Sequence, residues 1–177
     1  MLIRELTRQE CLDVLAGTHL GRLACSQLMQ PYIVPIHFAR QNSCLYGFST
    51  PGQKIDWMRA NPLVCVEADQ MRREQWTTVV VFGRYEELPN TAETRSERAL
   101  AWRLLQQKAA WWESGTAKIT QGGEPSALDS IFYRIHIVQI TGRHATFEPT
   151  APDTRQSTAN WAKRGWLHKV LRQVRGR

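Results

Sequence analysis

The sequence predicts a mainly β (α+β) protein, built as a small antiparallel barrel with flanking helices. Three observations predict this class. Short apolar stretches are separated by turn-forming residues, the links between several of them have hairpin length, and few segments between strands show helical periodicity. A doubly wound parallel sheet needs a helix after nearly every strand, so that class is excluded.

The amino-terminal part is predicted as one helix followed by a run of strands. Residues 4–16 carry apolar residues at helical spacing, Thr7 lies three residues before Glu10 as in a capping box, and Gly17 ends the helix. Four apolar stretches then follow, with turn signals between them. The predicted strands are residues 20–26, 32–39, 44–49 and 63–68.

Two helices and two strands complete the predicted domain. A short helix is expected over residues 51–61, with Thr50 as its cap and Pro51 at its first position. Residues 91–112 have helical periodicity over about six turns. A charged link is expected at residues 69–75 and a glycine-containing loop after residue 112. The two strands are a long one at 76–88, in which Gly83 marks a bulge or bend, and a closing one at 131–147.

The net charge of +7 is concentrated at the carboxyl end. Residues 152–177 contain seven lysines and arginines and one aspartate, so the rest of the chain is nearly neutral and lacks the basic surface of a nucleic-acid-binding domain. We therefore predict a domain at 1–148 and a basic tail at 149–177, partly helical or disordered. Binding of the tail to nucleic acid or to an acidic membrane surface is the alternative.

The chain is expected to be cytoplasmic and to lack metal sites. No apolar run approaches the roughly 20 residues of a membrane span, and the amino terminus has no secretory apolar region. The four cysteines lack metal-ligand spacing and are predicted to be reduced core residues. His136 and His144, eight residues apart on one strand, are expected on the same face but about 25 Å apart. Glu86 and Glu87 are expected at a solvated sheet edge.

The turn at residues 49–54 carries the strongest chemical signal. A strand ending at Ser49 and Thr50 that passes into a helix presents hydroxyls, backbone N–H groups and the positive end of the helix dipole at one point. Gln53 adds an amide and Lys54 an ammonium. Two interpretations stay open from these residues alone: an anion site, or a helix that is merely capped by hydroxyls.

Three longer stretches carry a family resemblance: PYIVPIHF at 31–38, LYGFSTPGQKID at 45–56 and RANPLVCVE at 59–67. They resemble the pyridoxamine 5'-phosphate oxidase-like FMN-binding proteins, in particular the branch of nitroimidazole-resistance (Nim) proteins. The resemblance covers roughly residues 6–147. It implies a Greek-key split β-barrel that forms a homodimer, with an FMN in each of two clefts between the subunits.

The resemblance also implies which residues contact FMN. The phosphate would be held in the turn, where Phe48 replaces a histidine common in Nim-like proteins. An aromatic side chain from the partner subunit would cover the ring. The implied residues are Phe48, Ser49, Thr50, Gln53 and Lys54 around the phosphate, Val34, Pro35, Ile36 and His37 along the isoalloxazine, Trp76 and Thr78 on the long strand near its pyrimidine side, and Trp111 or Trp112 as the cover.

Two of these assignments keep a structural alternative. His37 is a weak candidate for a chemical role, because a histidine on an apolar strand is more often structural. The pair Trp111 and Trp112 could equally pack in a dimer core.

The implied function is an FMN-dependent oxidoreductase that passes electrons from NAD(P)H to a small acceptor. Vitamin B6 oxidation itself is not expected, because residues 32–35 lack the arginine that the true oxidases carry there. No dinucleotide-binding Gly-x-Gly-x-x-Gly turn is present, so the nicotinamide would bind transiently over the flavin. The alternatives are a non-enzymatic flavin-binding or flavin-sensing protein and a haem-binding relative of the same fold.

Overall fold

The structure is a computed structural model of the 177-residue chain. It describes residues 1–107, 118–121, 124–127 and 130–147, so the predicted tail lies outside the described residues. Met1–Phe147 form one compact unit. No helix in the described ranges is long and apolar enough to cross a bilayer.

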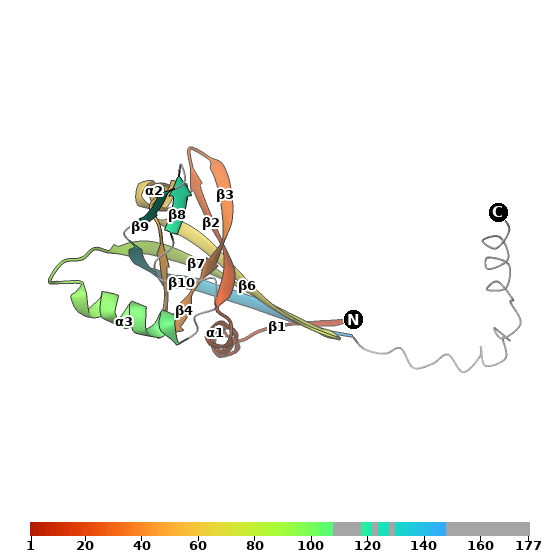
Figure 1. Ribbon diagram of the computed structural model, residues 1–177. Helices are drawn as coiled ribbons and strands as arrows, with labels where there is room; N and C mark the ends of the chain where they lie inside the picture. The colour runs from red at the N-terminus through yellow and green to blue at the C-terminus, as the bar shows by residue number, and fades with distance from the viewer. Residues whose placement is uncertain (108–117, 122–123, 128–129, 148–177) are drawn as a thin grey trace, which may run out of the picture. The chain divides into compact units, whose positions relative to one another are not determined.

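The unit is built on an open antiparallel sheet of eight strands in the order β3-β2-β6-β7-β10-β5-β4, with β1 paired to β10 (Figure 1). This confirms the predicted mainly β, split-barrel fold class. The described elements are β1 (Leu2–Glu5), α1 (Arg8–Gly17), β2 (Leu20–Gln27), β3 (Gln30–His37), β4 (Ala39–Gln41), β5 (Cys44–Ser49), α2 (Gln53–Ala60), β6 (Leu63–Arg72), β7 (Gln75–Leu88), α3 (Arg95–Gln106), β8 (Lys118–Gln121), β9 (Glu124–Ala127) and β10 (Ile131–Thr146).

The first helix begins later than predicted, because a strand precedes it. The expected start at residue 4 is wrong: β1 occupies Leu2–Glu5 and pairs with the end of β10. The capping box is confirmed, since the Thr7 N–H donates to the Glu10 carboxylate at 2.8 Å and the Glu10 N–H donates to Thr7 Oγ1 at 3.3 Å. The box therefore fixes the helix start at Arg8.

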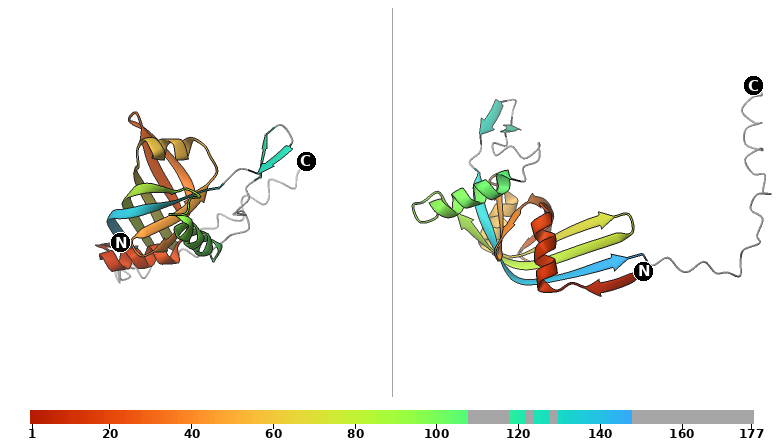
Figure 2. Two further views of the ribbon diagram at one scale, coloured as in Figure 1. Left: turned by 90° about the vertical axis from the view of Figure 1, so that its left-hand side faces the viewer. Right: turned by 90° about the horizontal axis from the view of Figure 1, so that it is seen from below.

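The expected charged link at residues 69–75 is also wrong. β6 continues to Arg72 and pairs in register with β7 from Gln75, so only Arg73 and Glu74 form the turn. Polar residues are tolerated here because the far halves of β6 and β7 extend from the barrel as an arm, together with β1 and the end of β10 (Figure 2). Backbone pairing holds this arm, and one face of it needs no apolar cover.

Glu86 and Glu87 lie at a local sheet edge, as expected, because β6 pairs with β7 only as far as Arg84 and these two residues pair with β10 alone. Their carboxylates are not left to solvent, contrary to expectation. Glu86 accepts two hydrogen bonds from Arg134, at 2.8 and 2.9 Å, and Glu87 accepts two from Arg59, at 2.7 and 2.8 Å. Both carboxylates are thus neutralised by bidentate arginine contacts.

A bulge in β10, between Ile137 and Gln139, lies opposite the predicted irregularity at Gly83. A Cβ atom on Gly83 would lie 2.4 Å from Ile135 Cγ2 and 2.8 Å from the His136 carbonyl oxygen. The bulge also reverses which residues face each side of the sheet. His136 pairs with Arg84 and His144 with Thr77, so the two histidines lie on opposite faces, not on the same face.

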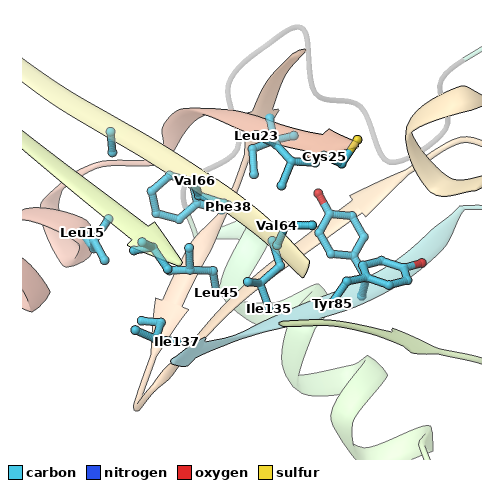
Figure 3. Packing of buried hydrophobic residues seen from close by; sticks show 14 of the residues in the cluster. Leu15, Leu23, Cys25, Phe38, Leu45, Val64, Val66, Tyr85, Ile135 and Ile137 are labelled. Atoms are coloured by element: carbon cyan, nitrogen blue, oxygen red, sulfur yellow. The ribbon is translucent and has the colours of Figure 1, made fainter. Parts of the chain in front are cut away.

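Two apolar clusters hold the described unit together. The larger lies on the inner face of the sheet, where Leu15 of α1 packs with residues of the strands such as Leu45 and Val66 (Figure 3). Ile55 of α2 belongs to the same cluster. The smaller lies under α3 and includes Tyr46, Leu105 and Phe132. α3 begins at Arg95, four residues after its expected start, and positions 108–112 of the predicted helix lie outside the described residues.

Two short strands were not predicted. β8 and β9 pair with each other in register, Gln121 opposite Glu124, in the segment expected as a loop. The intervening Gly122 and Gly123 are a two-residue hairpin signal that could have found them.

A polar cluster joins α3 to the sheet. Besides binding Glu86, the Arg134 guanidinium lies 3.2 Å from Glu97 of α3, and the Tyr46 hydroxyl donates to Glu97 at 3.2 Å. Hydrogen bonds from Arg134, and then from His136, lower the pKa of Glu86 from 4.5 to about 2.

Glu86→Gln should flatten the acid side of the stability profile. Because the pKa of Glu86 is lower in the folded state than in the unfolded state, its stabilising contribution is present above pH 4.5 and is lost as the pH falls toward about 2. Urea unfolding of wild type and variant over this range measures the difference. Glu74→Gln, at the exposed β6–β7 turn, is the control. Equal losses of stability in wild type and Glu86→Gln would contradict the prediction.

Candidate functional site

The turn between β5 and α2 differs from the prediction in its capping. α2 begins at Gln53, two residues later than expected, and Gly52 is its N-cap residue with φ 154° and ψ −179°, a region that essentially only glycine adopts. No side chain caps the helix, and the Ser49 hydroxyl donates to the Thr50 carbonyl oxygen at 3.0 Å. The interpretation as a hydroxyl-capped helix therefore fails, and the start of α2 is open to an external acceptor.

Lys54 lies half-buried at this helix start. Burial lowers the pKa of its ammonium, and the neighbouring Cys25 thiol has only a minor opposing effect. No carboxylate among the described residues pairs with Lys54. A partly desolvated cation without a counter-charge is unfavourable, so this position attracts an anion.

α2 is held against the hairpin of β2 and β3, which brings the turn to the predicted ring-binding strand. The Asn61 side-chain amide donates to the backbone oxygen and the hydroxyl of Ser26, both at 3.2 Å. The Trp57 ring lies edge-on to Tyr32 of β3, with centroids 5.5 Å apart. Both contacts hold the carboxyl-terminal half of α2 against the β2–β3 hairpin.

The four predicted residues of β3 point to two sides of the strand. Ile36 is buried in the core and Val34 packs against it, whereas Pro35 is exposed on the outer face of the sheet. His37 is half-buried, with its ring 5.7 Å from that of His19 in an edge-on contact. Side-chain contacts with a ligand on the outer face are thus open to Pro35, while Val34 and Ile36 can offer only backbone groups.

Thr78 belongs to a charged cluster on the same outer face. Its hydroxyl donates to Glu67 Oε1 at 3.1 Å, and Arg22 Nη1 donates to Glu67 Oε2 at 3.1 Å and to Asp69 Oδ1 at 2.7 Å. Arg22 pairs with Pro35 on one side and Glu67 on the other. Sequence reasoning missed Arg22, Glu67 and Asp69, although charges within apolar strands were an available signal.

Trp76 and Thr78 line a cavity of about 470 Å³ on the arm. Its walls come from β7, β10 and β1, and Glu5 and Arg143 contribute charged groups to its lining. Trp76 is 42% exposed. The cavity was not predictable in this form, because no strand was expected at β1 and its last two residues were expected in the first helix.

Other predicted residues are not brought to this surface. Phe48 packs on Phe132 under α3, with ring centroids 6.0 Å apart, on the opposite face of β5 from Ser49. Trp111 and Trp112 lie outside the described residues. The described part of the chain contains no cluster of histidine, cysteine and carboxylate groups able to hold a metal ion. All four cysteines are free; Cys11 and Cys25 are buried as predicted, whereas Cys44 and Cys65 are only half-buried.

Comparison with known proteins settles the family. A family model described as pyridoxamine 5'-phosphate oxidase matches residues 7–144. The chain belongs to this family. It is 47% identical over 146 residues to an uncharacterized protein of Rhizobium meliloti, which covers 82% of this chain and 97% of the relative.

Solved structures of oxidase-like proteins agree with this placement. A FAD-binding protein from Mesorhizobium loti has 42% identity and a TM-score of 0.69, over 83% of this chain and 99% of that one. A NimC/NimA family protein from Clostridium acetobutylicum shares the fold, with 18% identity, a TM-score of 0.50 and coverage of 78% and 87%. The predicted resemblance to the pyridoxamine 5'-phosphate oxidase-like proteins, including Nim-like ones, is confirmed.

The oxidase-like sheet also exposes an apolar patch on its outer face. Ile33, Cys65 and Phe82 lie in one row across β3, β2, β6 and β7, and Leu63 and Val138 adjoin them. Four of these side chains are largely exposed: Ile33 65%, Leu63 63%, Phe82 49% and Val138 70%. A contiguous exposed patch of this kind is typical of an interaction surface.

Proposed function

We propose that this protein binds a flavin nucleotide, with its phosphate at the start of α2. The half-buried Lys54, which no described carboxylate neutralises, is the observation that carries the proposal. A phosphate there accepts from the uncapped helix start, the Lys54 ammonium, the Gln53 amide and the Thr50 hydroxyl, and also from the Ser49 hydroxyl once this turns away from the Thr50 carbonyl oxygen. The similarity to a FAD-binding protein at 42% identity supports the choice of a flavin.

The ring system is proposed to lie on the outer face between Pro35 and Thr78. The Thr78 hydroxyl proton is already donated to Glu67, so the Thr78 oxygen can face a ligand only as an acceptor. The N3–H group is the donor on the pyrimidine edge of a flavin, and it suits this acceptor. Trp76 and the adjoining cavity extend the surface beyond that edge.

Thr78→Val should weaken flavin binding by about 0.5–1.5 kcal/mol, the net contribution of one neutral hydrogen bond. The variant keeps the β-branched shape and removes only the hydroxyl. Flavin affinity, measured by fluorescence quenching, is the readout. Thr77→Val, whose hydroxyl contacts His144 on the other face of β7, is the matched control. Equal affinities for Thr78→Val and wild type would remove Thr78 from the site.

Titration of the apoprotein with FMN, FAD and riboflavin tests the proposal directly. The family resemblance implies FMN, whereas the relative from Mesorhizobium loti binds FAD; both ligands contain riboflavin phosphate. Tighter binding of FMN or FAD than of riboflavin supports the phosphate site, and the preference between the two identifies the nucleotide. Binding of none of the three would overturn the proposal, and a Soret band in the purified protein would favour haem.

A second copy of the chain is proposed to cover the apolar patch. In this homodimer the flavin would lie in each of two clefts between subunits. The row of exposed apolar side chains that adjoins the charged cluster supports this arrangement, because dimer interfaces are more apolar than ordinary surface.

Phe82→Glu should convert the dimer to a monomer, since an unpaired charge buried at an interface costs about 3–5 kcal/mol. Sedimentation velocity measures the change. Met29→Glu, at the fully exposed β2–β3 turn, should leave the dimer intact. A wild-type protein that sediments as a monomer would refute the dimer.

The proposed activity is an oxidoreductase that uses NAD(P)H and a small acceptor. When bound, a flavin supplies hydride and electron chemistry, and the protein contributes binding, orientation and exclusion of water. The polar residues of the site are proposed to perform those roles, and His37 lies on the same side of β3 as Pro35, two residues away. Anaerobic mixing with NADH or NADPH is the test. Bleaching of the flavin band followed by reoxidation by an acceptor supports an enzyme, and absence of bleaching favours a flavin-binding or flavin-sensing protein.

A further inference from the structure

A cysteine, a histidine and a glutamate form a chain of contacts away from the proposed flavin surface. Cys44 of β5 lies directly opposite His136 of β10, and its Sγ is 3.5 Å from His136 Nδ1. His136 Nε2 is 2.5 Å from Glu86 Oε2 on β7. Cys44 borders the apolar cluster under α3, so the chain of contacts lies at the margin of that helix.

The contacts of Glu86 determine which nitrogen of His136 donates a hydrogen bond and which can accept one. Arg134 holds Glu86 in a bidentate contact, which keeps the carboxylate ionised and limits it to accepting from His136 Nε2–H. In a neutral imidazole the other nitrogen, Nδ1, then carries a lone pair, and this lone pair faces Cys44 Sγ. His136 is thus oriented as a base toward the thiol, in the manner of a nucleophile–base–carboxylate arrangement.

The surrounding charges shape the thiol's reactivity. Burial raises the pKa of Cys44, Arg134 opposes this rise, and Glu97 and Glu86 add to it. Arg84, paired with His136 on the same face, is the remaining charged neighbour from the adjoining strands. The resting group is therefore a neutral thiol, whose proton moves to His136 only while a bond forms to sulfur. The nearby carboxylates disfavour anionic reagents.

Cys44 differs in this respect from the other three cysteines. Cys11 and Cys25 are buried, and Cys65 is half-buried like Cys44. Among the described residues, a histidine nitrogen contacts the thiol only at Cys44. Cys65 has no such base, but it lies in the apolar patch that the proposed dimer covers, so the control for the base is Cys44 itself in the His136→Asn variant.

We propose that Cys44 is a site of oxidation by small uncharged hydroperoxides, with His136 as the base and Glu86 as its positioning residue. The sulfur attacks one peroxide oxygen, an S–O bond forms and the O–O bond breaks. The thiol proton passes to His136 Nδ1 and then to the leaving group, so that hydroxide from hydrogen peroxide becomes water and alkoxide from an organic hydroperoxide becomes an alcohol. The sulfur loses two electrons and becomes a sulfenic acid, while the peroxide is reduced.

The test follows each cysteine separately in the full-length protein. A brief exposure to hydrogen peroxide in the presence of dimedone, which traps sulfenic acids, is followed by quantification of each cysteine peptide by mass spectrometry. Cys44 of the wild type should be labelled at least about tenfold faster than Cys44 of the His136→Asn variant, a modest value for general-base assistance. Cys44 should likewise react faster with the uncharged iodoacetamide than with the anionic iodoacetate. Labelling of wild-type Cys44 no faster than Cys44 of this variant would overturn the proposal.

Variants then separate the roles of the neighbours. His136→Asn should lower the Cys44 rate at least about tenfold, and Glu86→Gln should lower it partly. His144→Asn, which alters the histidine on the other face, is the matched control and should leave the rate unchanged. An unaltered Cys65 rate in each variant shows that the fold is kept. If the His136→Asn variant keeps the wild-type Cys65 rate and also labels Cys44 at the wild-type rate, His136 is not the base.

Discussion

Lys54→Met is expected to weaken FMN binding by about 1.5–3 kcal/mol, or roughly 10- to 150-fold, while leaving riboflavin binding unchanged. Methionine keeps the apolar stem that packs beside Cys25 and removes only the ammonium, so a loss specific to the phosphorylated ligand reports the charge. The half-buried position should place the effect toward the upper end of this range, because a partly desolvated contact is screened less by water.

A second cation on the same helix provides the control for this experiment. Arg59 is exposed and is already neutralised by Glu87. Arg59→Met should therefore leave FMN affinity within about twofold of wild type, since its charge is not available to a ligand. Equal losses in Lys54→Met and Arg59→Met would indicate a general charge effect, and unchanged affinity in Lys54→Met would place the phosphate elsewhere.

Gly83→Ala is expected to produce the largest loss of stability from a single added methyl group. The new Cβ would lie 2.4 Å from Ile135 Cγ2 and 2.8 Å from the His136 carbonyl oxygen, and the backbone atom cannot move without disturbing the bulge in β10. Overpacking of this kind costs about 1–3 kcal/mol or more. Denaturant unfolding of the purified variant measures it.

Gly17→Ala is the matched control for the added methyl group. Gly17 is the last residue of α1, and its Cβ would meet only the Gln70 side chain, at 3.5 Å. Alanine is the better helix former, so this variant should be as stable as wild type or more stable. A Gly83→Ala protein as stable as Gly17→Ala would show that the β7–β10 bulge relaxes freely.

The predictable parts of the fold were those set by neighbouring residues. β5 was predicted with its observed bounds because its apolar run is bracketed by turn residues, and the Thr7–Glu10 capping box acted as expected. β1 was missed because its strand conformation depends on pairing with β10, from the other end of the described unit. The charged end of β6 was assigned to a link for a related reason, since its partner strand, not its composition, makes it a strand.

In the candidate site too, residues that are contiguous in the sequence could be predicted, and residues brought together by strand pairing could not. The residues of the turn from Ser49 to Lys54 could be named from the sequence because they are contiguous. The cluster of Arg22, Glu67 and Thr78 depends on the register of three strands, and a shift by one residue would have turned these groups to the other face. The bulge at Ile137 shows the same dependence, because it alone reversed the expected relation of His136 and His144.

The pairing of the first strand with the last has a consequence during synthesis. Leu2 of β1 pairs with Thr146 of β10, and β10 also joins β5 to β7. A ribosome-bound chain that ends before β10 can form the hairpin of β6 and β7 but cannot close either side of the sheet. Its β1 and one edge of β7 remain unpaired until almost the whole unit has emerged, so folding is expected to be late, slow and dependent on protection of those edges in the nascent chain.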